Sequence, residues 1–415
     1  MNFFFAPLEG ITGYVYRNAH HQLFGDGIAA YYTPFVVSNY TKKLKTRERM
    51  DVLPENNRDT PIVPQILANN ADEFLYTARI MADLGYREVN INLGCPVRTV
   101  VVKHKGSGML QDVDALDRFL DGVYEGAEKI LVDSTPSASS PADALSGNAS
   151  IKAPADNISP VPLRVSVKTR IGFESVAEAP AIFKVYNRYP ISKLIVHART
   201  RQEQYAGQPH IEVFRQIMEN CSLPLCYNGN INTVGDFRRL CAVLADRQPL
   251  PAADSRGQAD KLNSSKHSRF NNAQSSEPVS ESSSPDGSMT MATISPETEL
   301  PCDVMIGRGL LADPGLVRRI LTGQKTTLEE LRAFHARLYE GYQQQYASFH
   351  SSQSSGETVV INRMKEIWTH MGESFDDQGR YLKNIHKARN RVEYEAAVRM
   401  LFGNCALKEP AAGLH

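Results

Sequence analysis

The chain has 415 residues, of which 42% are hydrophobic, and its formal net charge is zero. This length fits two domains, or one large α/β domain with an appendage, and the hydrophobic content is sufficient for a packed core. A neutral chain has no global field that attracts nucleic acid, so any basic surface must be local. No apolar run approaches the ~20 residues that a membrane-spanning helix needs, so we expect no membrane association.

The cysteines give no sign of a metal site or of a disulfide framework. The chain contains no CxxC pair, and the apolar start "MNFFFAPLEG" lacks the charged region of a signal peptide. The six cysteines are scattered, as Cys95, Cys221, Cys226, Cys241, Cys302 and Cys405. We therefore expect reduced thiols in a cytoplasmic, metal-free protein.

Eight short apolar runs, each followed by a turn and then helix-compatible sequence, predict parallel strands buried on both faces. They begin at Phe3, Ala29, Pro61, Glu88, Leu163, Ser192, Leu223 and Cys302. Amphipathic stretches such as "ADEFLYTARIMADLGY" lie between them. Eight β–α repeats indicate a TIM barrel in residues 1–323. An open doubly wound sheet is the alternative, but "APLEGITG" lacks the GxGxxG motif that such a sheet carries after its first strand.

Two segments interrupt the repeats, at about residues 133–162 and 247–299. Both are rich in small and polar residues, and neither has hydrophobic periodicity. Because such segments cannot offset their ordering entropy by burial, we expect low-complexity, disordered insertions within the barrel domain.

From residue 324 to residue 415 the sequence predicts helices only, in a small all-α domain. The stretch from Arg380 to Arg391 contains no acidic residue, and we expect it to lie within one helix that ends near Phe402. On that helix Arg380, Lys383, Lys387 and Arg391 would share one face. A solvated face is the alternative, but such faces usually mix signs, so this one favours phosphate binding.

In a TIM barrel the functional residues lie at the carboxyl ends of the strands. In this chain those ends are mostly polar, and their residues include Pro7, Leu8, Glu9, Gln65, Asn92, Cys95, Lys168, Arg170, His197, Arg199, Asn228, Gly229, Asn230, Gly307 and Arg308. Cys95 precedes a basic segment that is punctuated by glycine, a place where a cysteine can do chemistry.

Several of these residues suit a flavin. Gly307 and Arg308, before a helix that we expect to open at Asp313, can donate hydrogen bonds to a phosphate. Lys168 projects from an apolar strand and needs an anionic or electron-rich partner. Gln65 and the amide at the end of the seventh strand can bind a planar ring. We therefore predict flavin mononucleotide (FMN) across the barrel mouth.

The motifs at these positions resemble those of the tRNA-dihydrouridine synthases, flavoenzymes that reduce uridines in tRNA. The matching stretches are "APLEGIT", "PQIL", "NLGCPVRTVVVKHKGSGML", "VKTRIG", "VHARTRQEQYAG", "NGNI" and "IGRGLLADP". The cysteine motif with its trailing Gly-x-Gly is the specific one. The resemblance covers the barrel and implies that a helical, tRNA-binding domain follows it.

By this resemblance Cys95 is the general acid that protonates C5 of the uracil while the flavin delivers hydride to C6. NADPH is the implied reductant. We expect Gly106 and Gly108 to give the cysteine loop the freedom to close on an extruded base. The protein is expected to act as a monomer.

The resemblance also assigns binding residues. FMN is expected to contact Pro7, Leu8, Glu9, Gln65, Lys168, His197, Asn228, Gly229, Asn230, Gly307 and Arg308. The tRNA is expected to contact Asn92, Lys103, Lys105, Arg170, Arg199, Lys383, Lys387 and Arg391. The alternative for His197 is an ordinary, packed core histidine.

The chain departs from the family pattern at two positions. Asn230 stands where the family usually has aspartate, and Leu8 where it usually has methionine. We expect flavin binding to be retained. One alternative function is a flavin barrel that acts on a free pyrimidine, like dihydroorotate dehydrogenase, but the basic helical tail has no use there. Another is a non-catalytic RNA-binding protein, which would not need Cys95 and Lys168.

Overall fold

The computed structural model describes residues 1–39, 41, 43–133, 160–245, 300–347, 353–377 and 379–408, with only the backbone for 353–355. The expected insertion at 247–299 lies outside the described residues, as does most of the one at 133–162. The described ends of the latter meet, because β7 (Leu131–Val132) pairs antiparallel with β8 (Val161–Pro162). Residues 161 and 162 are therefore part of a strand and not of an insertion.

The predicted TIM barrel is confirmed. Within the described residues, ten parallel strands form one sheet, and they are β1 (Phe3–Phe5), β2 (Ile28–Tyr32), β3 (Val36–Val37), β4 (Ile62–Val63), β5 (Gln65–Leu67), β6 (Glu88–Leu93), β9 (Arg164–Gly172), β10 (Leu194–Thr200), β11 (Leu225–Asn228) and β12 (Asp303–Ile306). The last strand, β12, pairs with β1. Because β2 pairs with β4 and β3 with β5, the sheet closes on itself.

The ten strands correspond to the eight predicted ones, because two of those are split. Pro34 lies between β2 and β3, and Pro64 lies between β4 and β5. Proline has no N–H for the ladder, so each strand is interrupted there. The side chain of Thr33 helps to bridge the gap by accepting a hydrogen bond from the backbone N–H of Gln65 at 3.0 Å.

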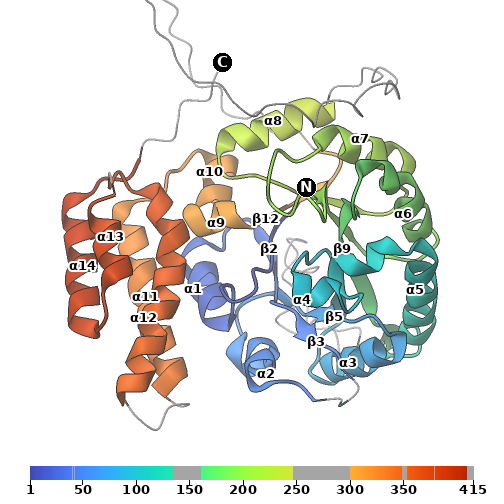
Figure 1. Cartoon of the computed structure of the whole chain (residues 1–415), viewed down its shortest axis with the longest axis horizontal. Helices are drawn as coiled ribbons and strands as arrows, with labels where there is room; N and C mark the ends of the chain where they lie inside the picture. Colours follow the sequence, from blue (N-terminus) through green and yellow to red (C-terminus); the bar gives the residue numbers. More distant parts are fainter. Residues whose placement is uncertain are drawn as a thin grey trace, which may run out of the picture.

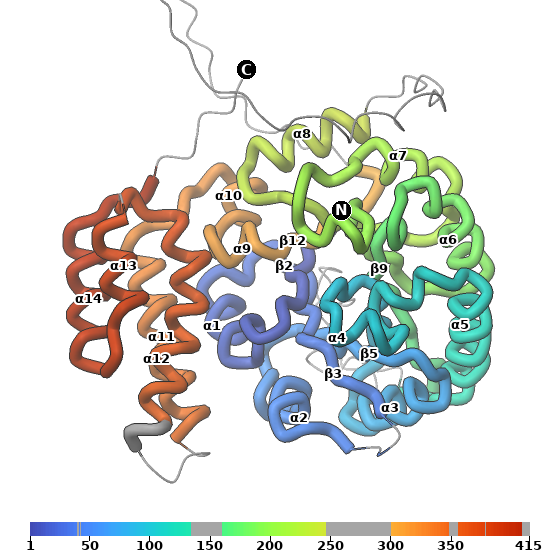
Figure 2. Tube along the Cα trace, in the orientation of Figure 1, coloured from blue at the N-terminus to red at the C-terminus, as the bar shows by residue number. Residues whose placement is uncertain are grey.

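Helices surround the barrel, as Figures 1 and 2 show. In chain order they are α1 (Tyr14–Phe24), α2 (Thr46–Val52), α3 (Ala71–Asp83), α4 (Arg98–Val101), α5 (Val113–Ala127), α6 (Ala179–Tyr186), α7 (Ile211–Asn220), α8 (Val234–Ala245), α9 (Arg308–Ala312) and α10 (Leu316–Thr322). The helix that we expected to open at Asp313 begins instead at Arg308. Asp313 separates α9 from α10 and accepts a hydrogen bond from the Thr326 hydroxyl at 2.6 Å.

Two layers of apolar side chains hold the barrel together. The larger one lies between the strands and the surrounding helices and includes Phe3 and Phe5 of β1. Phe4 points the other way, as alternation along a strand requires, and joins a second cluster inside the barrel. Phe4 and Ala6 of that cluster come just before the residues that follow β1 at the barrel mouth. The packed interior therefore supports the polar residues at the carboxyl ends of the strands.

The chain after the barrel is helical, as predicted. It contains α11 (Leu328–Ala347), α12 (Gln353–Met371), α13 (Tyr381–Lys387) and α14 (Arg391–Asn404), which we call the C-terminal helices. They pack beside α1 and α9 (Figure 1). Phe334 of α11 lies edge-on against Tyr16 of α1, with ring centroids 5.5 Å apart.

The prediction of one continuous helix from Arg380 to Phe402 is wrong. The chain leaves the helix at Ala388 and begins α14 at Arg391, because the side chain of Asn390 caps the new helix by accepting from the N–H of Glu393. Arg391 therefore does not continue the basic face of α13. Its side chain pairs with Glu395 at 2.7 Å.

Candidate active site

A cavity of about 370 Å³ opens at the carboxyl ends of the strands. This is large enough for a small-molecule ligand. It brings together the predicted residues Pro7, Leu8, Glu9, Gln65, Asn92, Cys95, Lys168, Arg170, His197, Asn228, Gly229, Asn230, Gly307 and Arg308. Seven strand ends, far apart in the sequence, thus contribute to one site.

A relay of amide side chains fixes the wall of the cavity that carries the cysteine. Asn92 donates to Gln65 Oε1 at 2.7 Å, and Gln65 donates to Asn90 at 2.8 Å. The oxygen of Asn92 accepts from the backbone N–H of Cys95 at 2.9 Å and from that of Gly94 at 3.1 Å. Because both ends of its amide are bonded, Asn92 holds the turn on which the thiol sits.

The two glycines after Cys95 allow close packing, and the loop closure that we expected of them stays a prediction. Gly106 has φ of +58°, and a Cβ there would lie 2.9 Å from the carbonyl oxygen of Cys95. A Cβ on Gly108 would lie 2.6 Å from the carbonyl oxygen of Val101. The same Cys95 carbonyl accepts from the N–H and the hydroxyl of Ser107. The loop is therefore packed against the cysteine.

Cys95 is half-buried, and burial raises the pKa of its thiol, although the backbone N–H of Val97 and the charge of Arg170 lower it. The net direction is upward, so the sulfur keeps its proton at neutral pH. A protonated thiol that lines a ligand cavity can act as a proton donor.

Lys168 lies on β9 and donates to Asn228 Oδ1 at 2.8 Å. Burial, and then the nearby charge of Arg170, lower the pKa of Lys168 to about 8. Among the described residues no carboxylate pairs with its ammonium group. The cavity thus holds a cation that is balanced only by a neutral amide, which favours an anionic or electron-rich ligand.

Burial also lowers the pKa values of two basic groups near Lys168. Burial lowers the pKa of His197 well below its usual value, and the charges of Arg170 and Lys168 lower it further, so the imidazole is neutral. Burial also lowers the pKa of Arg170 to about 10. Arg170 donates through Nε to the carbonyl of Gly94 and through Nη1 to Thr200 and Gln204, all at 2.8 Å. Those bonds hold the cysteine turn and the β10–α7 loop together.

On the opposite rim, Asn230 joins two arginines. Its Oδ1 accepts from Arg199 at 3.2 Å and from Arg308 at 3.1 Å. Arg199 is fully buried and also donates to the carbonyls of Ala206 and Gly207. It does not line the cavity, so its guanidinium supports the loop and is unsuited to the substrate contact that we predicted.

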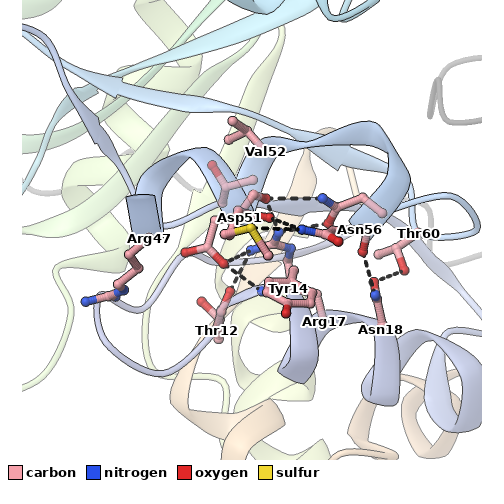
Figure 3. Close-up of polar contacts among 12 residues, drawn as sticks. Thr12, Tyr14, Arg17, Asn18, Arg47, Asp51, Val52, Asn56 and Thr60 are labelled. Atoms are coloured by element: carbon pink, nitrogen blue, oxygen red, sulfur yellow. Dashed lines mark hydrogen bonds and ion pairs between the residues drawn. The ribbon is translucent and has the colours of Figure 1, made fainter. Parts of the chain in front are cut away.

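Glu9 stands at the rim near Cys95 and is paired with Arg47 of α2 at 3.0 Å. A buried polar cluster holds α2 in place (Figure 3). In it Arg17 donates to the carbonyls of Thr12 and Asp51, and Asp51 accepts from the N–H of Tyr14 at 2.8 Å. This cluster ties α2 to the first turn of α1, directly after the loop that carries Glu9.

The predicted basic RNA contacts differ in their surroundings. Lys103 and Lys383 are exposed, as is Lys387. Lys105 is not: its ammonium group donates to the carbonyl of Ser38 at 2.7 Å and lies 3.6 Å from Glu73. It is therefore a structural tie between the cysteine loop and α3, and it is unsuited to meet an RNA phosphate.

Further residues line the cavity that were missed from sequence, and among them Phe35, Tyr205 and His370 bring aromatic rings. Tyr205 is 55% exposed, and the guanidinium groups of Arg308 and Arg170 lie over its ring at 5.1 and 5.5 Å. The stretch "RTRQEQYAG" gave a signal for Tyr205, since an aromatic residue follows two arginines. The position of His370 depends on tertiary packing, so the sequence contained no local signal for it.

No described helix is long and apolar enough to cross a membrane. Within the described part of the chain, no three histidine, cysteine or acidic side chains are grouped as metal ligands.

Comparison with known proteins identifies relatives of this chain. The family model described as dihydrouridine synthase matches residues 4–129 and 150–245, together more than half of the chain.

The tRNA-dihydrouridine(16) synthase of Cupriavidus necator is 26% identical over 244 residues, which cover 58% of this chain and 66% of that protein. The tRNA-dihydrouridine synthase B of Xanthomonas campestris is 25% identical over 229 residues, covering 55% and 58%. A probable tRNA-dihydrouridine synthase of Rhizobium leguminosarum is 26% identical over 243 residues, covering 57% and 62%. The chain thus spans about three fifths of the length of these relatives.

Proposed function

Because the chain belongs to the dihydrouridine synthase family, we propose that it reduces uridines in tRNA to dihydrouridine, with FMN as cofactor and NADPH as reductant. One observation carries the proposal: a protonated thiol, Cys95, and a cation without a carboxylate partner, Lys168, line the same cavity at the barrel mouth. A non-catalytic RNA-binding protein would need neither. Reduction of a pyrimidine needs a proton donor on one side and stabilisation of negative charge on the other.

The side chains that line the cavity support the choice of FMN as cofactor. Lys168 supplies a cation for the electron-rich edge of the ring, and the amides of Gln65 and Asn228 lie in the same wall. Gly229 has no room for a side chain, since a Cβ there would lie 2.2 Å from the hydroxyl of Tyr227. Arg308 adds a positive charge on the side where we place the phosphate.

When bound, FMN would supply the hydride that adds to C6 of the uracil. Cys95 then holds the proton for C5 on Sγ, and its raised pKa keeps that proton available at neutral pH. Asn92 orients the cysteine turn through its oxygen, while Arg170 fixes the same turn from the other side. Arg170 Nη2 has no hydrogen-bond partner among the described residues, and we assign it to a uracil carbonyl.

The C-terminal helices are proposed as the RNA-binding domain, residues 324–415. Lys383 and Lys387 of α13, with Arg380 at its start, form a basic surface that suits the phosphates of a polynucleotide. Since C5 and C6 of a uridine are stacked within folded tRNA, the target base must be extruded to reach Cys95. A cytoplasmic location and a monomeric state belong to the same proposal.

The test is reduction of tRNA by the purified protein. Protein reconstituted with FMN is incubated with NADPH and an unmodified tRNA transcript, and dihydrouridine is measured by mass spectrometry of the digested RNA. We expect dihydrouridine with the wild type and none with Cys95→Ala in the same time. Conversion of free uracil or orotate in preference to tRNA would contradict the proposal.

A further inference from the structure

Helix α12 is held against the barrel mouth at two points. Near its middle, Arg363 donates to the carbonyl of Gly10, in the loop between β1 and α1. Just after its end, the hydroxyl of Ser374 donates to the carbonyl of Ala312, the last residue of α9, at 2.5 Å. The second point fixes the end of α12 beside the short helix whose first residue is Arg308.

His370 lies between these two points, one residue before the end of α12. Two turns separate it from Arg363, so both residues share the face that borders the barrel. Among the described residues it is the only member of the C-terminal helices that lines the active-site cavity. Its ring is half-buried and has no hydrogen-bond partner within the described part of the chain.

Charges of both signs act on His370, and of the two residues that supply them Arg308 lines the cavity whereas Glu373 does not. Burial lowers the pKa of His370, the carboxylate of Glu373 raises it, and the charge of Arg308 lowers it. Arg308 forms no ion pair with the carboxylates that the structure describes, and it shares one neutral amide oxygen, on Asn230, with Arg199. The carboxylate in the lining of the cavity is that of Glu9, and it is paired with Arg47. The guanidinium of Arg308 and an imidazole N–H of His370 therefore provide two donors for a phosphate oxygen.

We propose that His370 and Arg308 together bind a phosphate group at the barrel mouth, so that a C-terminal helix supplies part of the ligand site. The inference rests on the proposed function for its choice of ligands. Two sources carry this chemistry: the phosphate monoester of FMN, and a phosphodiester of the tRNA backbone beside the extruded uridine. In either case α12 contacts the ligand directly, in addition to any role of the basic surface on α13.

The experiment uses the full chain and measures binding, which does not depend on turnover. Dissociation constants are determined for FMN, by quenching of flavin fluorescence with apoprotein, and for an unmodified tRNA transcript, by anisotropy with FMN-loaded protein. The variants are His370→Ala, His370→Asn, Arg308→Ala and the double variant. Asn362→Ala, on an exposed position of the same helix, is the matched control.

We expect His370→Ala to raise one of the two dissociation constants by roughly tenfold, which is the effect of losing a hydrogen bond to a charged group. His370→Asn, which keeps a donor, should recover part of the loss, and Asn362→Ala should change nothing. Weaker FMN binding identifies the monoester as the ligand, and weaker tRNA binding alone identifies the phosphodiester. The losses in the double variant should fall short of the sum of the single losses, because both residues contact one group.

The inference is overturned if His370→Ala binds FMN and tRNA like the wild type, or if its effect and that of Arg308→Ala are additive. A loss that His370→Asn does not recover, accompanied by a lower melting temperature, would show a structural role and also overturn it. Failure of the wild type to reduce tRNA would refute the proposed function instead, while the FMN titration would still report on His370.

Discussion

Lys168 Nζ donates to Asn228 Oδ1 at 2.8 Å across the intervening strand β10. The bond joins β9 to β11 inside the cavity and gives the ammonium group a neutral partner only. A carboxylate there would have neutralised the lysine, whereas the amide orients it and leaves its charge for a ligand. The cavity is therefore ready to receive negative charge at this point.

Replacing Lys168 tests whether that charge serves the flavin. We expect Lys168→Met, which keeps most of the side-chain volume, to bind FMN more weakly and to slow flavin reduction by NADPH. Each effect should be about tenfold or more, because the variant loses a hydrogen bond from a charged group. Stopped-flow absorbance measures the reduction. Lys184→Met, on an exposed part of α6, is the control. Unchanged affinity together with unchanged reduction would show that Lys168 does not face the flavin.

The pH dependence of flavin binding should report the same lysine. Its pKa is lowered to about 8, so the cation is present below pH 8 and is lost above it. Affinity of the apoprotein for FMN should therefore fall by up to roughly tenfold between pH 7 and pH 9. Lys168→Arg keeps its charge over this range and should give a flatter profile. If the wild type and Lys168→Arg show the same dependence of FMN affinity on pH, Lys168 is not the titrating group.

Cys95→Ala should separate proton delivery from hydride delivery. The variant should bind FMN and accept hydride from NADPH like the wild type, because the thiol takes part in neither step. Oxidation of the pre-reduced enzyme by saturating tRNA should slow by roughly 10²–10⁴-fold, the usual contribution of a positioned acid. Single-turnover absorbance measures it, and Cys221→Ala, on a half-buried cysteine outside the cavity, is the control. Wild-type oxidation by Cys95→Ala would mean that another group donates the proton.

Reversing the charge of the basic surface on α13 should affect tRNA affinity and leave the chemistry unchanged. We expect Lys383→Glu combined with Lys387→Glu to raise KM for tRNA and to reduce its salt dependence, with kcat and FMN content unchanged, because phosphate contacts supply affinity. Arg391→Glu is a useful comparison, since Arg391 is engaged by Glu395 and should contribute less. A fall in kcat at saturating tRNA would indicate that α13 also orients the RNA for reaction.

Stability should decrease in acid through buried neutral histidines. His335, in the core of the C-terminal helices, has its pKa lowered by burial to about 4. In the unfolded chain its pKa is about 6.5, so the unfolded state binds the proton first and stability falls as the pH drops from about 6.5 to 4. Between pH 6.5 and pH 5 the loss is about 2 kcal/mol for this residue.

Burial is the cause of the lowered pKa of His335, and its hydrogen bond suits the neutral ring. Trp368 donates to the hydroxyl of Tyr394, and that hydroxyl can then donate to His335 Nε2 at 2.7 Å. Urea unfolding at pH 7 and pH 5 tests the point. His335→Gln should be less stable than the wild type at pH 7 but should lose less on acidification, whereas the exposed variant His104→Gln should follow the wild type. Parallel losses in all three proteins would exclude His335 as a source of acid sensitivity.

The fold and most of the cavity followed from the sequence because strand ends in a barrel converge by construction. Once eight apolar runs are assigned to parallel strands, Gln65, Lys168 and Asn228 must meet at one mouth, although they are far apart in the chain. The two split strands were also foreseeable, because Pro34 and Pro64 mark the breaks.

Other features depended on partners that a linear pattern does not specify. Lys105 and Arg199 looked free in sequence, yet the carbonyls that bind them come from distant segments or from a folded loop. His370 reaches the cavity only because α12 packs on α9. The break before Arg391 is different, since the capping pattern of Asn390 followed by Glu393 was present in the sequence and was overlooked.

The closure of the barrel by β1 and β12 has a consequence for how the protein forms. Phe3 is paired with Val304, so β1 cannot complete its ladder until about 300 further residues have been synthesised. At the usual 5–20 residues per second of synthesis, that wait is roughly 15–60 s. During that time β1 has one unpaired edge and three adjacent phenylalanines without their final neighbours. The unpaired edge of β1 is therefore an aggregation risk during synthesis, and we expect chaperone binding at β1 until β12 emerges.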